Sequence, residues 1–382
     1  MDYDPIKILS ELVACKSLTP DTDGVLEVLD NYLKPMQFSS KTLVFGEKNE
    51  KVDNLFVSLG SGSPHFCFAG HTDVVPSGNQ SLWKFPPFNP TVHEKIFYGR
   101  GTVDMKGSIA CFISSVDKFL NNFKNFKGRI SFLITNDEEG PAINGTKKVI
   151  EWLNETGNVP DFCIVGEPTN SESIGDTIKI GRRGSLSGEI KVSGKQGHVA
   201  YPHLAENPFP ILFKMLDPLI KFELDEQTQF FPKSTASITS VDTNNSANNV
   251  IPETVTAKFN IRFNDSLSRE KLESFLINHF DSVSKNYEVK FTSNAYPFIT
   301  KPEKQLDSLT KAIEYVSNII PEFSTSGGTS DARFISKYCP VVEFGLVGKN
   351  MHQVDESSKI SDIYLLKDIY YEFLKNYFIL NK

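Results

Sequence analysis

The first 165 residues show two distinct patterns of apolar and polar positions, one typical of strands and one typical of helices. Three short runs are apolar and rich in β-branched and aromatic residues, as buried strands are: 65–69, 129–135 and 161–165. Between and around them, apolar residues recur at three- and four-residue spacing, which predicts helices over 5–15, 25–33, 105–120 and 144–154. Strands that alternate with helices favour an α/β fold whose mixed or mainly parallel sheet is covered on both faces.

After residue 182 the order of the predicted elements changes. The pattern predicts strand, helix, strand, strand, helix and strand, at 186–193, 207–222, 235–241, 254–263, 268–280 and 287–292. This βαββαβ order is the split βαβ arrangement of a ferredoxin-like α+β module.

From about residue 297 the sequence again resembles the first part of the chain, where strands alternate with helices. It predicts a strand over 341–344 and helices over 303–319 and 361–378, with a Gly/Ser/Thr-rich loop at 324–330. The simplest organisation is one α/β domain formed by residues 1–181 and 296–382, into which a second domain, residues 182–295, is inserted. A chain of 382 residues is also long enough for two cores.

The composition of the chain limits the kinds of binding partner that we expect. Forty basic and 47 acidic residues give a net charge of −7 without a Lys/Arg-rich block, so we expect no nucleic-acid partner. The acidic N-terminus lacks the features of a signal peptide, and we expect no membrane partner because no apolar stretch would span a bilayer. Five scattered cysteines without a Cys-x-x-Cys motif fit reduced thiols in a cytoplasmic protein.

Chemically active residues follow the predicted strands. The strand ends lead to His71, to the Glu138–Glu139 pair and to Glu167, and Asp104 opens the helix over 105–120. Ligands of open α/β sheets collect outside the carboxyl ends of the strands, so we expect these side chains to lie close together.

The adjacent carboxylates Glu138 and Glu139 need compensation if they are buried. Neighbouring side chains on a tight turn point in different directions, so one can bind a metal ion while the other faces a substrate. A solvated acidic loop is the alternative. The similar residues at the other strand ends favour a functional site.

Two imidazoles and three carboxylates form the candidate ligand set: His71, Asp104, Glu139, Glu167 and His352. This mixture fits zinc or another borderline divalent ion rather than an all-oxygen calcium site. Five ligands exceed one tetrahedral site with an open position, whereas two ions that share a carboxylate would use them all. Asp73 is close enough in sequence to hold the second ring nitrogen of His71. Glu138 is left beside the metals, where a general base belongs.

Four motifs together resemble the aminoacylase-type dinuclear zinc peptidases: residues 70–76, 98–107, 137–141 and 165–169. Five further motifs resemble members of this family that hydrolyse succinyl amides: residues 181–186, 197–203, 249–252, 327–331 and 343–345. The resemblance covers nearly the whole chain in order. It implies that the α/β domain is the catalytic dinuclear zinc domain and that the insert is a dimerisation and lid domain.

The resemblance also implies roles for the ligands. Asp104 would bridge two Zn²⁺ ions in each subunit, with Co²⁺ able to replace one of them. His71 and Glu167 would complete one site, and Glu139 and His352 the other.

Outside the ligands, the resemblance implies that Glu138 is the general acid/base and Asp73 the residue that orients His71. His198 in the insert would reach the active site of the partner subunit and stabilise the oxyanion, so the protein would be a homodimer. The substrate-binding positions would be Arg182, Ser185, Asn249, Arg262, Gly328 and Thr329. The implied reaction is hydrolysis of N-succinyl-LL-2,6-diaminopimelate to succinate and LL-2,6-diaminopimelate, in lysine and peptidoglycan-precursor biosynthesis.

Two alternatives stay open. The chain could be another amide hydrolase of the same family, such as an acetylornithine deacetylase or a dipeptidase, and the distinguishing features are Arg182-Arg183 and residues 327–330. It could also be a non-catalytic binding protein that kept the fold. The second alternative predicts that a ligand or the base has been lost, and all of them are present.

Overall fold

The computed structural model describes residues 3–221, 223–301 and 304–380, and the chain divides into two compact units. The first unit comprises Met1–Ile180, Thr300–Ser324 and Ser330–Lys382, and the second comprises Gly181–Ile299 and Thr325–Thr329. Three stretches that we expected in the first domain therefore belong to the second unit: residue 181 and the segments 296–299 and 325–329. Residues 222 and 303, which we expected at a helix end and a helix start, lie outside the described residues.

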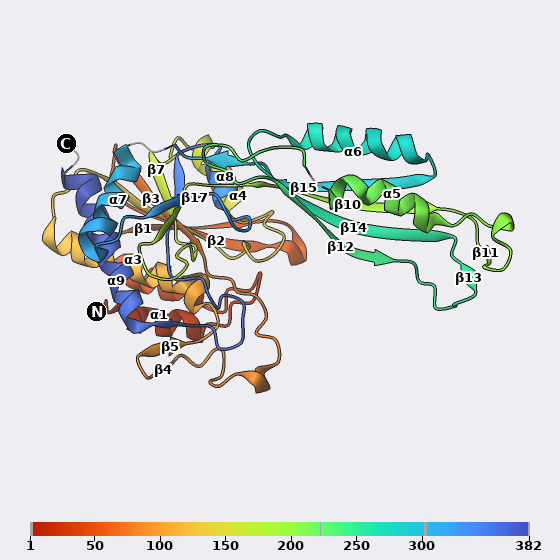
Figure 1. The fold of residues 1–382 in the computed structure, drawn as a ribbon. Coiled ribbons are helices and arrows are strands. Elements are labelled where there is room, and N and C mark those ends of the chain that lie inside the picture. The colour runs from red at the N-terminus through yellow and green to blue at the C-terminus, as the bar shows by residue number, and fades with distance from the viewer. Residues whose placement is uncertain (1–2, 222, 302–303, 381–382) are drawn as a thin grey trace. The chain divides into compact units, whose positions relative to one another are not determined.

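An eight-stranded mixed sheet, part of which is labelled in Figure 1, forms the centre of the first unit. Its strand order is β1-β2-β6-β3-β7-β18-β8-β17. β6, β3, β7 and β18 run parallel to one another, whereas β1, β2 and β6 are joined by antiparallel pairing. The strands are β1 Ser39–Phe45, β2 Val52–Ser61, β3 His65–His71, β6 Gly128–Thr135, β7 Phe162–Val165, β8 Thr177–Lys179, β17 Glu322–Ser324 and β18 Val341–Glu343.

Helices flank this sheet, and the first unit also contains a small three-stranded sheet in the order β19-β5-β4. The helices of the first unit are α1 Pro5–Ala14, α2 Val25–Leu33, α3 Gly107–Asn122, α4 Thr146–Glu155, α7 Lys304–Ser317, α8 Ala332–Ile335 and α9 Ile360–Lys375. The small sheet consists of β4 Thr91–His93, β5 Ile96–Tyr98 and β19 Ser357–Lys359. Among the residues that the structure describes, no helix is both long and apolar enough to cross a membrane.

Aromatic contacts place helices on both faces of the large sheet. The ring of Phe68 in β3 stacks on Phe112 of α3, with the ring centroids 4.4 Å apart. Phe132 of β6 is the register partner of Phe68 and shares that face. Phe56 of β2 pairs with the residue after Phe132, so it points to the opposite face, where its ring meets Trp152 of α4. The predicted sheet flanked by helices is thus confirmed.

The centre of this core gives a stability prediction for Phe112. Its fully buried ring contacts the rings of Phe66, Phe68, Phe132 and Tyr370. We expect Phe112→Ala to lower the free energy of unfolding by about 3–5 kcal/mol, because the cavity cannot collapse against a rigid sheet. Denaturant unfolding monitored by circular dichroism measures this. Tyr315→Ala is the control, since that ring is 73% exposed. Equal losses for both variants would contradict the prediction.

The second unit has one four-stranded antiparallel sheet, in the order β12-β14-β10-β15. Its main elements are β10 Gly184–Ser193, α5 Pro208–Ile220, β12 Thr235–Asp242, β14 Thr254–Phe263, α6 Arg269–Val283 and β15 Tyr287–Ala295. Short strands complete it: β9 Gly181–Arg182 with β16 Phe298–Ile299, and β11 Gly197–His198 with β13 Val250–Ile251. The βαββαβ order and this sheet order are those of a split βαβ module.

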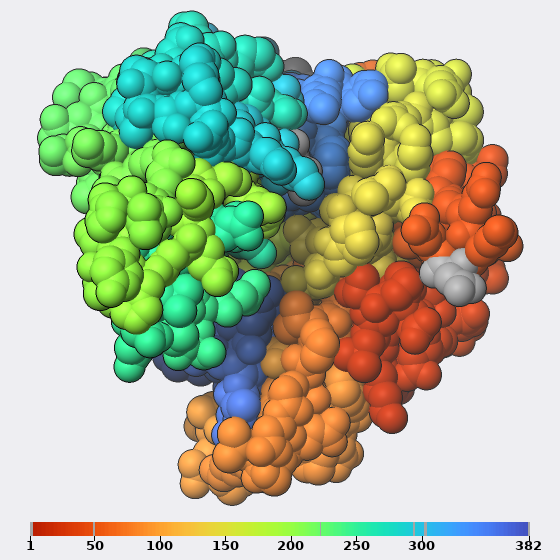
Figure 2. Space-filling model, turned by 90° about the vertical axis from the view of Figure 1, so that its right-hand side faces the viewer, coloured from red at the N-terminus to blue at the C-terminus, as the bar shows by residue number. Residues whose placement is uncertain are grey.

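One face of this sheet forms the core of the second unit. Buried residues alternate along β10, and Ile190 and Val192 pack in one cluster with Met215 of α5 and Phe280 of α6. The two helices contact each other and lie side by side at the surface, α5 in light green and α6 in cyan in Figure 2. Because buried and more exposed residues alternate along the strand, the opposite face of the sheet is polar.

Candidate dinuclear metal centre

Three neighbouring parallel strands carry candidate ligands to one edge of the large sheet. His71 is the last residue of β3, Glu138 and Glu139 follow β6, and Glu167 follows β7. Because these strands are adjacent and parallel, their carboxyl ends meet. The apolar, β-branched sequences of the strands therefore bring together polar residues that are far apart in the chain.

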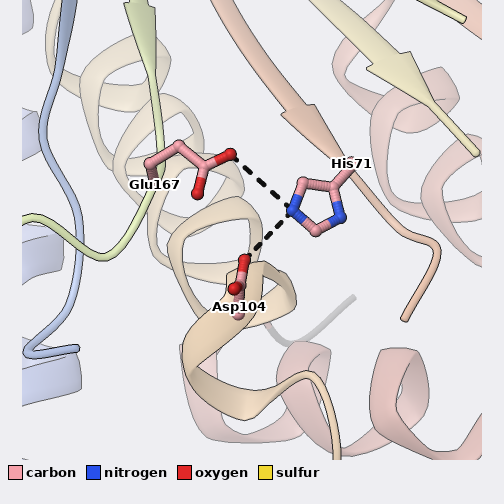
Figure 3. Close-up of side chains that lie close together, drawn as sticks. All are labelled: His71, Asp104 and Glu167. Carbon is pink, nitrogen blue, oxygen red and sulfur yellow. Dashed lines mark hydrogen bonds and ion pairs between the residues drawn. The ribbon is translucent and has the colours of Figure 1, made fainter. Parts of the chain in front are cut away.

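Asp104 lies between two histidines. It occupies the irregular turn Thr102–Lys106 directly before α3, where its own backbone is not helical. Its Oδ1 is 3.1 Å from Nε2 of His71, and its Oδ2 is 3.1 Å from Nε2 of His352. Glu167 Oε1 lies 3.8 Å from the same His71 nitrogen, an arrangement visible in Figure 3, and Glu139 Oε1 lies 2.8 Å from His352 Nε2.

These contacts define two ligand groups that share one carboxylate. His71, Asp104 and Glu167 form one group and Asp104, Glu139 and His352 the other, each with its ligand atoms within 4.8 Å of one another. One imidazole and two carboxylates in each group fit zinc or a similar divalent ion. Glu138 also comes within this distance of His71 and Glu139, so proximity by itself does not separate it from the ligands.

Without a metal ion, protons on the imidazoles balance the carboxylates. Hydrogen bonds to Asp104 and Glu139 raise the pKa of His352 to about 10. Burial opposes a charge on His71, but the contact with Asp104 outweighs it and raises the pKa of His71 well above its usual value. Burial likewise opposes ionisation of Asp104, yet the bonds from both imidazoles hold its pKa below the usual range. A bound cation would replace these protons.

Glu138 differs from the ligands in its electrostatics. Burial, followed by the negative charge of Glu167, raises the pKa of Glu138 well above its usual value. A carboxyl group with high proton affinity beside a ligand cluster is suited to accept and return a proton.

Asp73 supports the site in a different way from the one we expected. The Nδ1–H of His71 donates to the backbone carbonyl of Asp73 at 2.9 Å, while the carboxylate lies 3.6 Å away. That buried carboxylate instead accepts the backbone N–H groups of Glu138 and Glu139, at 3.3 and 3.0 Å, and the hydroxyl of Thr19 at 2.7 Å. Asp73 thereby fixes the position of the Glu138–Glu139 turn as well as the His71 ring.

Sequence reasoning missed a buried group behind the ligands. Arg100 and Glu356 form a buried ion pair that contacts the backbone of both Asp104 and His352. Asp331 is also buried, and burial raises its pKa to about 6. Arg100 and Asp331 lie inside the motifs at 98–107 and 327–331, so those motifs could have pointed to them. The pairing of Arg100 with Glu356, 256 positions away, leaves no signal in the sequence pattern.

The expected substrate-binding residues and His198 belong to the second unit, where they form separate groups. Ser185 of β10 is the cross-strand partner of Arg262 of β14, and Arg182 donates to the carbonyl of Ser326 at 3.2 Å. His198 is exposed in β11, where the N–H of the next residue donates to the carbonyl of Asn249 at 3.1 Å. Gly328 and Thr329 lie in the segment 325–329 of the same unit.

The fold and the paired ligand groups define a metal-dependent hydrolase of the dinuclear peptidase class. Residues 67–376 match Peptidase family M20/M25/M40, and the chain belongs to this family. It is 48% identical over 382 residues to the succinyl-diaminopimelate desuccinylase of Beijerinckia indica subsp. indica, covering 99% of this chain and 100% of that protein. The resemblance inferred from the motifs is therefore confirmed.

Solved structures confirm the fold. The M20 family metallo-carboxypeptidase Sso-CP2 from Sulfolobus solfataricus superposes with a TM-score of 0.78 at 20% identity, covering 99% of each chain. Aminopeptidase PepT from Bacillus cereus also gives 0.78, at 18% identity and 97% coverage of each chain. The Bacillus subtilis YXEP protein, a dinuclear metal-binding peptidase of the M20 family, gives 0.68 at 15% identity, covering 97% of this chain and 96% of that one.

Proposed function

We propose that the chain hydrolyses N-succinyl-LL-2,6-diaminopimelate to succinate and LL-2,6-diaminopimelate, with two Zn²⁺ ions bound per subunit. The observation that carries the proposal is the position of Asp104, whose two oxygens each face a different histidine–carboxylate group. The 48% identity to a desuccinylase along the full chain supports the choice of substrate. The product would serve lysine and peptidoglycan-precursor synthesis.

Under this proposal, His71, Asp104 and Glu167 hold one ion, and Glu139 and His352 hold the other together with Asp104. Co²⁺ would be able to replace one Zn²⁺, because the donor set suits both ions. Held by these residues, the ions would supply Lewis acidity, which lowers the pKa of a water at the site and polarises the amide carbonyl.

Glu138 performs the proton transfers in this proposal. It accepts a proton from the attacking water as the oxygen bonds to the amide carbon. When the C–N bond breaks, Glu138 returns the proton to the departing amine. The hydrogen bonds from the backbone of residues 138 and 139 to Asp73 support this role. They hold the turn in place through its backbone and leave the carboxyl group of Glu138 available for proton transfer.

The arginines of the second unit supply contacts for a substrate with several carboxylates. A guanidinium fork matches a carboxylate through two parallel hydrogen bonds, which a lysine cannot do. Ser185 lies opposite Arg262 in the sheet and adds a hydroxyl donor. We assign Arg182, Arg262 and Ser185 to the substrate carboxylates, together with Asn249, Gly328 and Thr329.

The proposal includes a two-fold dimer in which the insert forms the interface. The outer strands β12 and β15 of its sheet offer edges for pairing with a second copy. His198 would then stabilise the oxyanion in the active site of the partner subunit. All five cysteines carry free thiols, which is consistent with the reducing cytoplasm as the location.

Metal removal and substrate comparison test the proposal together. We expect dialysis against a chelator to abolish turnover and added Zn²⁺ or Co²⁺ to restore it, because the site is built from metal ligands. Release of primary amine measures the rate on N-succinyl-LL-2,6-diaminopimelate, N-acetylornithine and a dipeptide, with metal content determined in parallel. Full activity in metal-free protein would refute the dinuclear site. A kcat/KM for acetylornithine or the dipeptide as high as for the succinyl substrate would refute the assigned substrate.

A further inference from the structure

Arg100 and Glu356 form a charge pair that is almost completely buried in the first unit. The Nη1 of Arg100 donates to Oε2 of Glu356 at 2.6 Å, and the two side chains are 2% and 0% exposed. The guanidinium also lies over the ring of Trp83, at 5.2 Å from its centroid. The pair connects the segment before α3 to the segment before β19, which are far apart in the chain.

The second oxygen of Glu356 holds the backbone that carries Asp104. Oε1 accepts the N–H of Val103 at 2.8 Å and the N–H of Asp104 at 3.3 Å. In this turn the backbone at 104 and 105 is not helical, so regular helix hydrogen bonds do not hold it. The carboxylate therefore supplies an anchor for the shared ligand.

Arg100 anchors the backbone of the second ligand, His352. Its Nη2 donates to the carbonyl of His352 at 3.3 Å. His352 adopts a left-handed backbone with φ of 62°, which costs free energy for a residue with a side chain, and the imidazole is 47% exposed. A contact from the buried side holds this loop residue in the conformation that aims Nε2 at Asp104 and Glu139.

The ligands of the other group have different supports. His71 is held by the pairing of β3 with β6 and by the carbonyl of Asp73, and Glu167 lies two residues after the end of β7. The pair thus contacts the backbone of two of the three ligands in the Asp104–Glu139–His352 group. In the His71–Asp104–Glu167 group, the hydrogen bond from the pair that is seen among the described residues goes to the backbone of Asp104, the shared ligand.

We propose that Arg100 and Glu356 are positioning residues that selectively support the metal ion held by Asp104, Glu139 and His352. The inference rests on the proposed dinuclear centre. A buried ion pair adds little net stability compared with apolar residues of similar size, so stability alone does not account for this one. Its hydrogen bonds to the backbone of two ligands give it a specific role. Outer groups that orient metal ligands commonly account for 10- to 100-fold in metal affinity.

Zinc titration by competition with a chromophoric chelator tests this inference. We expect wild-type protein to bind two ions and Glu356→Gln to lose 10- to 100-fold in affinity for one of them, with the other unchanged. Glutamine can still accept from Val103 and Asp104 but presents an amide to Arg100. Because one unpaired buried charge can prevent folding, Arg100→Met/Glu356→Gln is made as well, and the same selective loss is expected.

A matched control and two backgrounds identify the affected site. Arg129→Met removes a guanidinium that is only partly buried and that binds Asn158 and Ser58 instead of the ligand segments, and it should leave both zinc affinities unchanged. In a His352→Ala background, Glu356→Gln should cause no additional loss of affinity, because the supported site is already gone. In a His71→Ala background it should weaken the remaining ion by the full 10- to 100-fold.

The outcomes separate this inference from the proposed function. Wild-type protein that binds fewer than two ions refutes the dinuclear centre itself. If wild-type binds two, then unchanged affinities in both Glu356 variants overturn the positioning role. An equal loss at both sites also overturns it, since that result means a general structural effect.

Discussion

Replacing Glu138 with glutamine should leave both ions of the proposed centre bound and remove nearly all turnover. The amide has the shape of the carboxyl group but cannot accept a proton from the attacking water. General acid–base catalysis typically contributes 10²–10⁴-fold, so we expect kcat to fall by about that factor while KM changes little. Steady-state kinetics on the zinc-loaded variant, with metal content measured on the same sample, determines both quantities.

The neighbouring residues provide the controls for this prediction. Glu139→Gln changes the adjacent carboxylate, which contacts His352 directly, so this variant should lose metal as well as activity. Glu172→Gln changes an exposed carboxylate and should alter neither. Retention of more than a few per cent of activity by Glu138→Gln with zinc restored would exclude Glu138 as the base. Loss of one ion would make it a ligand instead.

The strands that carry the site could be predicted because nearly all of their residues are buried. The runs predicted at 129–135 and 161–165 appear as β6 and β7 within one residue at each end. Buried parallel strands need continuous apolar sequence, and the ligands of open α/β sheets collect beyond their carboxyl ends. The convergence of His71, Glu139 and Glu167 therefore follows from the apolar pattern and the polar residues that end it.

Other elements lack such a signal for physical reasons. The edge strand β1 has a single buried residue, Leu43, so its sequence shows no apolar period. β8 and β17 are three residues long, too short for any periodicity to appear. The helix expected from residue 105 begins at Gly107, because the backbone N–H groups of the preceding turn donate to a carboxylate from a distant part of the chain, which holds that turn in another conformation.

The register of the second unit bears on the role of His198. Along β10, Ser185 pairs with Arg262 at one end, and Ser193 pairs with Thr254 at the other. Eight residues of strand separate these ends by roughly 26 Å at about 3.3 Å per residue. His198 and Asn249 lie beyond the second end, so within one chain they are remote from the expected arginine contacts. A substrate that uses both sets would need two chains.

A mixture of two inactive variants should therefore regain activity. Each heterodimer of Glu138→Gln and His198→Ala chains has one site that combines an intact Glu138 with an intact His198 from the partner. Random exchange at equal concentrations makes half the dimers mixed, so about a quarter of wild-type turnover is expected. Each variant alone should lose roughly 10²-fold or more. Differently tagged chains verify the exchange. If exchange is complete and the mixture stays as inactive as its parents, His198 acts within its own chain or takes no part, because only a shared site can be rebuilt by mixing.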